Sequence, residues 1–228
     1  MNWGAVIVAA GRGTRFGRPK QLIEIAGRPM LAWSVATFNA MPEIGRIVVV
    51  TEGEWLDEVH AAMKAIVDRE IAVVRGGATR QASVRCGLQA LGNACDAVLV
   101  HDGARPLVRA QDVRAGMDAV RSGRGAFLGA PVVDTIKVVD PQTRLVERTL
   151  DRTRLWAAQT PQFAMREELQ RAHDAAAASS LEATDDVALL EAIGIEVVVI
   201  PVSAENFKVT HPGDAARAEQ LLLGASVK

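Results

Sequence analysis

A glycine-rich segment with four cations lies near the start of the chain, and its residue types suit the binding of a polyanion. The segment follows an apolar run and extends from Ala9 to Lys20. Glycines let the backbone approach a ligand closely, and a turn of backbone N–H groups forms an anion-binding concavity. The cations would repel one another unless a polyanion lay between them, and they are Arg12, Arg15, Arg18 and Lys20. We interpret the segment as a loop that grips a nucleoside triphosphate.

Two other interpretations of this loop remain open. The spacing Gly11-x-Gly13-x-x-x-Gly17 resembles the dinucleotide-binding motif of nicotinamide-dependent oxidoreductases, but its third glycine is displaced by one position. That motif also requires a helix to begin at once, which Pro19 and Pro29 oppose. The second alternative is a solvated basic loop. A Walker A loop is excluded for this stretch because the Gly-Lys-Ser/Thr ending is missing.

Two further polar clusters follow apolar runs later in the chain. The first, from Gly76 and Gly77 to Ser83, fits either a tight turn before a capped helix or close approach to a base or ribose. In the second, Asp102 and Gly103 fit either a simple Asp turn or a site for a ribose hydroxyl or Mg²⁺. Arg105 would supply a cation for a phosphate there.

Apolar β-branched runs alternate with helical patterns along most of the chain, and this alternation predicts the elements that position the clusters. We expect strands at residues 5–9, 46–51, 71–74, 97–101, 126–133 and 196–200, and helices at 31–38, 55–67, 83–91, 113–120, 166–177, 186–193 and 215–223. Continuous Val/Ile runs indicate strands covered on both faces. The prediction is one α/β domain over 1–228, with a three-layer, mostly parallel, Rossmann-like sheet that binds ligands at the carboxyl ends of its strands.

Asp134–Pro161 breaks this alternation. Two extended segments flank a turn at Asp140–Thr143, which predicts a β-hairpin arm inserted after the fifth strand, at about 134–158. A two-stranded ribbon is marginal alone, so we expect the arm to pack on a second subunit. Arg152 is either an ordinary charge on this arm or a side chain that projects into an active site. Beyond the arm, Thr184 and Asp185 indicate a helix N-cap, and Lys208 matters only if the fold returns it to the first loop.

Composition sets the broad class of protein. The 228 residues are 49% hydrophobic, which is enough for a substantial core, and the net charge of −1 argues against a general nucleic-acid or membrane binder. Cys86 and Cys95 suggest neither a disulfide framework nor a metal cluster. No run of 18 apolar residues occurs, and we expect a cytoplasmic protein.

Taken together, these motifs resemble the 2-C-methyl-D-erythritol 4-phosphate cytidylyltransferases of the non-mevalonate isoprenoid pathway, in the sugar-nucleotide transferase-like superfamily. The resemblance spans nearly the whole chain, in the expected order. It rests on Ala9-Ala10-Gly11-x-Gly13-x-Arg15, Pro19-Lys20-Gln21, Gly76-Gly77-x-x-Arg80-x-x-Ser83, His101–Pro106, Asp134-Thr135-x-Lys137, Asp151-Arg152, Leu155-Trp156, Thr160-Pro161-Gln162, Thr184–Asp186 and Asn206-x-Lys208-Val209-Thr210. The loop between Arg15 and Lys20 is shorter than is usual in that family.

The resemblance implies a fold of the nucleotide-diphospho-sugar transferase type and transfer of a cytidylyl group from CTP to a polyol phosphate. It implies Mg²⁺, with Asp102 as a candidate neighbour, and a homodimer formed through the arm. The catalytic residues would be Arg15, Lys20 and Lys208. The nucleotide would bind Ala9, Ala10, Gly11, Gly13, Gly77, Ser83, Asp102 and Gly103. The acceptor would bind Arg105, Thr135, Arg152, Thr160, Thr184 and Asp185.

Related ribitol-5-phosphate cytidylyltransferases share most of these motifs, so that acceptor remains an alternative. A non-catalytic nucleotide sensor with the same fold also stays open.

Overall fold

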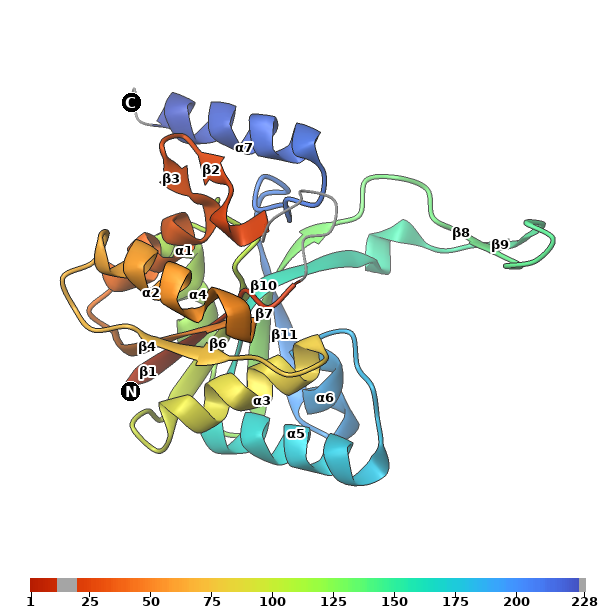
Figure 1. The fold of residues 1–228 in the computed structure, drawn as a ribbon. Helices are drawn as coiled ribbons and strands as arrows, with labels where there is room; N and C mark the ends of the chain where they lie inside the picture. The colour runs from red at the N-terminus through yellow and green to blue at the C-terminus, as the bar shows by residue number, and fades with distance from the viewer. Residues whose placement is uncertain (12–19, 226–228) are drawn as a thin grey trace.

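A seven-stranded sheet forms the centre of the computed structural model, which describes residues 1–11 and 20–225 (Figure 1). In order across the sheet, the strands are β11 (Glu196–Pro201), β7 (Arg124–Pro131), β10 (Trp156–Met165), β6 (Ala97–Asp102), β1 (Trp3–Val8), β4 (Ile44–Thr51) and β5 (Ala72–Arg75). Strand β10 runs antiparallel to β6 and β7, whereas the other neighbouring pairs are parallel. The expectation of a mostly parallel α/β sheet is therefore confirmed.

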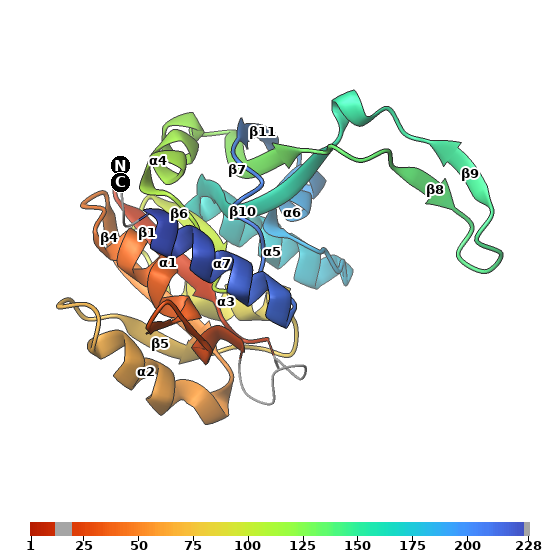
Figure 2. The same ribbon diagram turned by 90° about the horizontal axis from the view of Figure 1, so that it is seen from above.

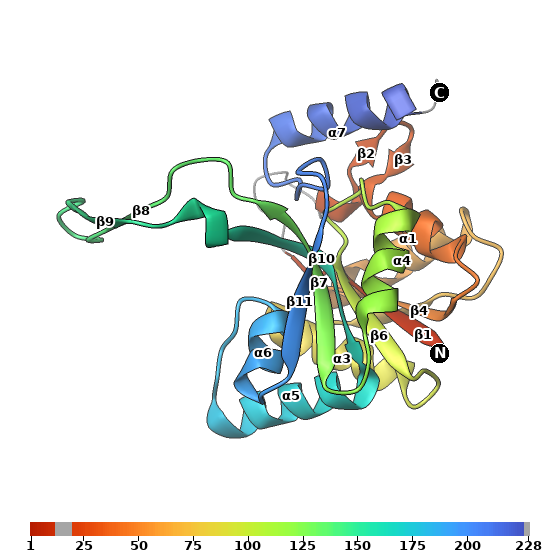
Figure 3. The same ribbon diagram turned by 180° about the vertical axis from the view of Figure 1, so that it is seen from behind.

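Helices cover both faces of the sheet, which confirms the three-layer arrangement (Figures 1 and 3). One face packs against α1 (Met30–Asn39), α2 (Leu56–Lys64) and α4 (Ala110–Ala119), and the other against α3 (Arg80–Leu91), α5 (Arg166–Ser179) and α6 (Asp186–Ala192). Side chains alternate along a strand, so Ile7 joins the first core and Val6 the second. Burial on both faces explains why the central strands are continuous apolar runs.

Smaller elements complete the chain near the carboxyl edge of the sheet. The short helix Lys20–Leu22 precedes a small hairpin of β2 (Glu24–Ile25) and β3 (Arg28–Pro29), against which α7 (Pro212–Ala225) packs (Figure 2). A further short helix, Gly53–Trp55, leads into α2. Cys86 and Cys95 are free thiols. Within the described part of the chain, no helix combines the length and the apolar character needed to cross a membrane.

The hairpin arm projects away from the sheet (Figures 1 and 2). It contains β8 (Lys137–Val139), β9 (Val146–Thr149) and the short helix Arg152–Arg154. Its turn lies where the sequence predicts it, because Asp140 Oδ1 accepts hydrogen bonds from the backbone N–H groups of Gln142 and Thr143 at 3.0 and 2.7 Å. Val133, Leu145 and Val146 are 77%, 69% and 60% exposed, which leaves the arm with an apolar surface that none of the described residues covers.

The prediction was wrong about the segment that follows the arm. We placed the arm at about 134–158 and expected no strand directly after it, yet Trp156–Met165 forms β10 in the middle of the sheet. Proline has no N–H to donate to a ladder, and the pairing of β10 with β7 shifts register between Ala158 and Gln162, on either side of Pro161. A polar segment interrupted by proline does not have the pattern of a central strand.

Candidate functional site

Hydrogen bonds between loops bring the predicted clusters together at the carboxyl edge of the sheet. The N–H of Ala9 donates to the carbonyl of Val50 at 2.7 Å, and that of Gly103 donates to the carbonyl of Val8 at 2.9 Å. The N–H of Gly76 donates to Thr51 O at 2.7 Å. The loops after β1, β5 and β6 are thereby fixed to neighbouring strand ends, as expected for an open α/β sheet.

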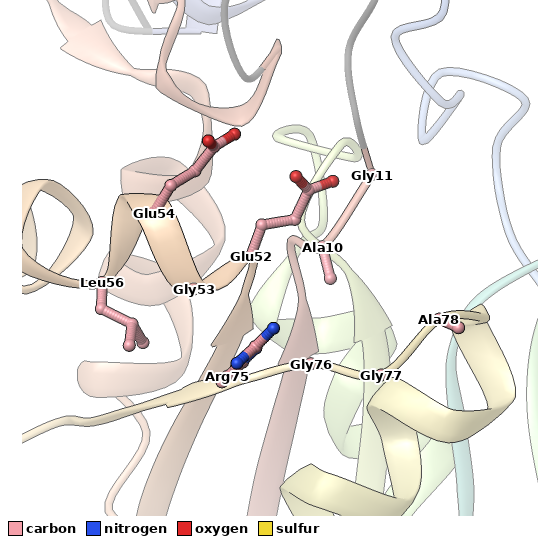
Figure 4. A pocket seen from close by; sticks show the side chains of 10 residues that line it. All are labelled: Ala10, Gly11, Glu52, Gly53, Glu54, Leu56, Arg75, Gly76, Gly77 and Ala78. Atoms are coloured by element: carbon pink, nitrogen blue, oxygen red, sulfur yellow. The ribbon is translucent and has the colours of Figure 1, made fainter.

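A cleft of about 1330 Å³ opens where these loops meet (Figure 4). Gly76 permits the close packing of its floor, because a Cβ there would lie 2.8 Å from Ala10 Cβ and 2.7 Å from Ser83 Oγ. Figure 4 shows Arg75 and Glu52 extending from strand ends into the cleft. The residues that line it are Ala10, Gly11, Glu52, Gly53, Glu54, Leu56, Arg75, Gly76, Gly77 and Ala78.

The segment from Gly76 to Ser83 forms the tight turn and capped helix of its first interpretation, and close approach to a base or ribose stays a prediction. Thr79 caps α3, since its side chain accepts a hydrogen bond from Ala82 N at 3.1 Å. The Ser83 hydroxyl donates to Thr79 O at 2.9 Å and accepts from Gly77 N at 3.2 Å. The capped turn is therefore also the wall of the cleft.

Two smaller cavities adjoin this region and share one wall. A cavity of about 180 Å³ is lined by residues of the first loop and α3, including Gly11, Gln21 and Ser83. A second, of about 280 Å³, is lined by residues of β6, β10 and the α6 loop, including Arg105, Thr160, Thr184 and Asp185. Both cavities are also lined by Arg80, Asp102 and Lys208.

Asp102 lies among three cations in this shared wall. Its Oδ2 accepts a hydrogen bond from Lys208 Nζ at 2.9 Å, and its Oδ1 accepts one from Arg80 Nε at 3.1 Å. Arg105 Nε lies 3.9 Å from Oδ2. Burial raises the pKa of Asp102, but the charges of Arg80, Lys208 and Arg105 outweigh burial and hold the pKa well below its usual range. Asp102 is therefore ionised at neutral pH, and its negative charge holds Arg80, Lys208 and Arg105 together beside the two cavities.

The loop that carries Lys208 is tied to this wall. Asn206 Nδ2 donates to Gln159 Oε1 at 2.9 Å and to Thr160 O at 3.0 Å. Arg105 Nη1 donates to Asn206 O at 2.8 Å. Lys208 lines the same cavity as Gly11 and Gln21, so the fold returns it to the described ends of the first loop, which was the condition for its importance.

The buried side chain of His101 orients the Thr160 hydroxyl through a hydrogen bond. Burial lowers the pKa of His101 to about 4, so the ring is neutral at pH 7. Its Nε2 lies 3.1 Å from the carbonyl oxygen of Arg105, which can only accept, so Nε2 carries the proton. Its Nδ1 therefore accepts the hydroxyl proton of Thr160 at 3.1 Å, and the Thr160 oxygen accepts Asp102 N–H at 3.0 Å. Thr160 keeps only an acceptor lone pair for a ligand.

Not all predicted site residues meet in one chain. Thr135 and Arg152 are arm residues outside the linings of these cavities, and Arg152 Nη1 donates to Val133 O at 2.8 Å. Asp185 caps α6 through Ala188 N at 3.0 Å, as its sequence context predicts. Gly13, Arg15 and the side chain of Lys20 lie outside the described residues.

Sequence reasoning missed Arg80 as a site residue, although it stands in a quoted motif. A usable signal existed: Arg80 is the first residue of α3, and a cation is unfavourable at the positive end of a helix dipole. Such a cation needs acidic partners, which here are Asp102 and Asp186. Gln162 was missed too, and its Oε1 accepts Asp186 N at 2.8 Å.

Asp102 does not fit a direct role in holding Mg²⁺, because both of its oxygens already accept from cations. A metal ion bound there would have to displace Lys208 or Arg80. Across residues 1–11 and 20–225, no group of three or more His, Cys, Asp and Glu side chains forms a metal cluster. A Mg²⁺ held mainly by phosphate and water oxygens fits this donor set better.

An open α/β sheet with a glycine-lined cleft beside a carboxylate ringed by cations has the features of an enzyme that binds phosphate-bearing ligands at its strand ends. The chain belongs to the 2-C-methyl-D-erythritol 4-phosphate cytidylyltransferase family, whose model matches residues 4–223. It is 40% identical over 220 residues to the enzyme of that name from a Nostoc species, covering 95% of this chain and 96% of that protein.

Two other similarities extend this result. The bifunctional enzyme IspD/IspF of Clavibacter michiganensis is 45% identical over 225 residues, which are 96% of this chain and 54% of that protein, so the chain spans about half of that relative. Among solved structures, 4-diphosphocytidyl-2C-methyl-D-erythritol synthase from Anaerococcus prevotii superposes with a TM-score of 0.87 at 27% identity, covering 97% of this chain and 96% of that one.

Proposed function

We propose that this chain converts CTP and 2-C-methyl-D-erythritol 4-phosphate to 4-CDP-2-C-methyl-D-erythritol and pyrophosphate. The observation that carries the proposal is the shared wall of Arg80, Asp102 and Lys208. It separates the cavity lined by Gly11, Gln21 and Ser83 from the one lined by Arg105, Thr160 and Thr184. A nucleotide that extends from the large cleft into the first cavity and a polyol phosphate in the second would meet at that wall.

The reaction is an in-line attack of an acceptor phosphate oxygen on the α-phosphorus of CTP. That oxygen is already anionic near neutral pH, so the site needs no strong general base. We assign no base role to the buried His101, because both of its ring nitrogens are already engaged in hydrogen bonds. Rate enhancement then comes from positioning the two phosphates and neutralising their charge.

Each predicted site residue has a role in this proposal. Lys208 neutralises the α-phosphate, and the acceptor is held by Arg105, Thr160, Thr184 and Asp185. Arg15 and Lys20 stabilise the pentacoordinate phosphorus and the leaving pyrophosphate. The backbone around Gly11 and Gly77, with Ala9, Ala10, Gly13, Ser83, Asp102 and Gly103, holds the nucleotide. Mg²⁺, when bound, shields phosphate charge and assists departure of pyrophosphate.

The arm supports a homodimer in which each chain completes the other's site. Its exposed Val133, Leu145 and Val146 would be covered by a second chain. Thr135 and Arg152 lie outside the linings of their own chain's cavities, and the dimer would bring them to the acceptor of the partner. A cytoplasmic location remains part of the same proposal.

The first experiment measures pyrophosphate release with CTP, Mg²⁺ and either 2-C-methyl-D-erythritol 4-phosphate or ribitol 5-phosphate. Release with the first acceptor alone supports the proposal, whereas preference for ribitol 5-phosphate keeps the mechanism and changes the substrate. Folded protein that binds CTP but releases no pyrophosphate would favour the nucleotide sensor. Binding of NADH instead would favour the oxidoreductase.

Arg152→Ala tests the arm directly. We expect a raised KM for the polyol phosphate with little change in CTP affinity, whereas Arg148→Ala, on the same exposed hairpin, should match the wild type. A mixture of Arg152→Ala and Lys208→Ala chains should then recover about a quarter of wild-type activity, because half of the dimers would contain one intact site of two. No recovery in a mixture shown to exchange subunits would place Arg152 in its own chain's site.

A further inference from the structure

Behind the shared wall, a buried chain of hydrogen bonds leads away from the site. Arg80 Nη1 donates to Asp186 Oδ2 at 2.8 Å, and Asp186 Oδ1 lies 3.0 Å from His173 Nε2. Asp186 is 1% exposed and His173 is fully buried. The three residues come from α6, α5 and the start of α3, which pack on the same face of the sheet (Figure 1). Neither Asp186 nor His173 lines the cavities described above.

Charge and hydrogen bonding determine the state of each member. Burial raises the pKa of Asp186, but the Arg80 charge and the His173 hydrogen bond outweigh it and lower the pKa. Burial lowers the pKa of Arg80, yet Asp186 and Asp102 outweigh it and raise the pKa. An ionised Asp186 only accepts hydrogen bonds, so His173 Nε2 carries a proton and is the donor of the hydrogen bond to Asp186 Oδ1. A continuous chain of donors and acceptors therefore runs from His173 to Lys208.

We propose that Asp186 and His173 are positioning residues for the transfer reaction: they fix the guanidinium of Arg80, which orients Asp102 and through it Lys208. This inference rests on the proposed cytidylyltransferase activity and extends it to two residues that touch neither substrate. Arg80 lines both cavities, so a change in its orientation alters the wall at which the two phosphates meet. Misplacement by about 1 Å can reduce a rate about a hundredfold.

A role in stability alone explains this arrangement less well. Buried ion pairs often contribute less to stability than apolar residues of similar volume, because desolvation offsets their attraction. His173 Nδ1 and Arg80 Nη2 are buried and have no hydrogen-bond partner among the residues that the structure describes. Unsatisfied buried groups are costly, so a core selected only for stability would avoid them. This series of hydrogen bonds fits a role in orienting the Arg80 guanidinium from the side that faces away from the cavities.

The test compares His173→Phe, which keeps the volume filled but removes the donor, with His173→Gln, which keeps an N–H donor. Leu169→Ala is the matched control, because Leu169 is a buried core residue of the same helix and takes no part in the series of hydrogen bonds from His173 to Lys208. Each variant is assayed for kcat and for both KM values by pyrophosphate release, for CTP affinity by calorimetry, and for Tm. We expect His173→Phe to lower kcat about tenfold with CTP affinity unchanged, and His173→Gln to restore most of the loss.

The outcomes separate the two proposals. Unchanged kcat in folded His173→Phe, or a loss of kcat that Leu169→Ala reproduces at equal Tm, would overturn the positioning role. In an Arg80→Gln background His173→Phe should cost nothing further, so additive losses would also overturn it. Should His173→Phe fail to fold, the isosteric Asp186→Asn makes the same test one hydrogen bond nearer to Arg80. A wild type that releases no pyrophosphate refutes the proposed function instead.

Discussion

Burial of His101 makes the stability of this protein depend on pH in the mildly acidic range. The ring is fully buried between β6 and its neighbours, and both nitrogens are hydrogen-bonded in the neutral state. Burial is the largest cause that lowers its pKa to about 4, against a smaller opposing effect of Asp102. The unfolded chain would hold the same ring at its ordinary pKa of about 6.5.

The sign and the size follow from these two values. Between pH 6.5 and 4 the unfolded chain binds a proton that the native state refuses, so stability rises with pH across this window. The contribution is complete above about pH 6.5, is lost as pH falls towards 4, and amounts to about 3 kcal/mol. About 2.5 kcal/mol of it should be gone at pH 4.5.

Urea unfolding at pH 7.5 and 4.5 tests this prediction in wild type and in His101→Gln. Subtracting the two cancels the carboxylates that also titrate, such as Asp102, because both proteins contain them. The wild type should lose about 2.5 kcal/mol more than the variant. Parallel profiles, or a wild-type His101 ring that titrates near pH 6.5 by NMR, would refute the assignment of a buried neutral histidine.

Two further substitutions test packing and capping. Phe163→Ala removes a ring that is 1% exposed and stacks edge-to-face on Trp3 at 6.1 Å, so urea unfolding should show a loss of about 3–5 kcal/mol; a loss below about 1 kcal/mol would contradict its place in the core. Asp185→Ala removes the α6 cap and the bond from Gln162 Nε2 at 2.9 Å, so it should cost about 1 kcal/mol and raise the KM for the polyol phosphate; an unchanged KM would remove Asp185 from the acceptor site.

Much of the fold could be predicted because the central strands obey simple rules. Val6, Val48 and Val100 belong to continuous apolar runs, and each lies in a strand covered on both faces. Strand β10 was not predicted from the sequence because Gln159, Thr160 and Gln162 are polar and bind specific partners. Gln162 holds the start of α6 and Thr160 holds Asp102, so these contacts, which no local pattern reveals, explain a strand of that composition.

The residues of the candidate site also fall into those that could be predicted from the sequence and those that could not. The rule that ligands bind beyond the carboxyl ends of parallel strands was sufficient to single out Asp102 and Arg105, and the resemblance added Lys208. Arg80, Asp186 and His173 were not predicted as a group, because a single sequence does not show which distant residues pair in the core. Only the helix-dipole conflict at Arg80 pointed towards a buried acidic partner.

Strand β10 also links the arm to the site, and this connection has a mechanical consequence. The arm leaves the sheet at Pro131 of β7 and returns at Trp156 of β10, two residues that pair directly. A few residues further along β10, Gln159 and Thr160 bind Asn206, two positions before Lys208. The pairing of β10 with β7 is interrupted between Ala158 and Gln162, so Gln159 and Thr160 follow the base of the arm directly along the backbone, and a second chain seated on the arm would bear on the segment that positions Lys208. In the proposed homodimer, assembly and turnover should therefore be coupled, even for arm residues that never reach a substrate.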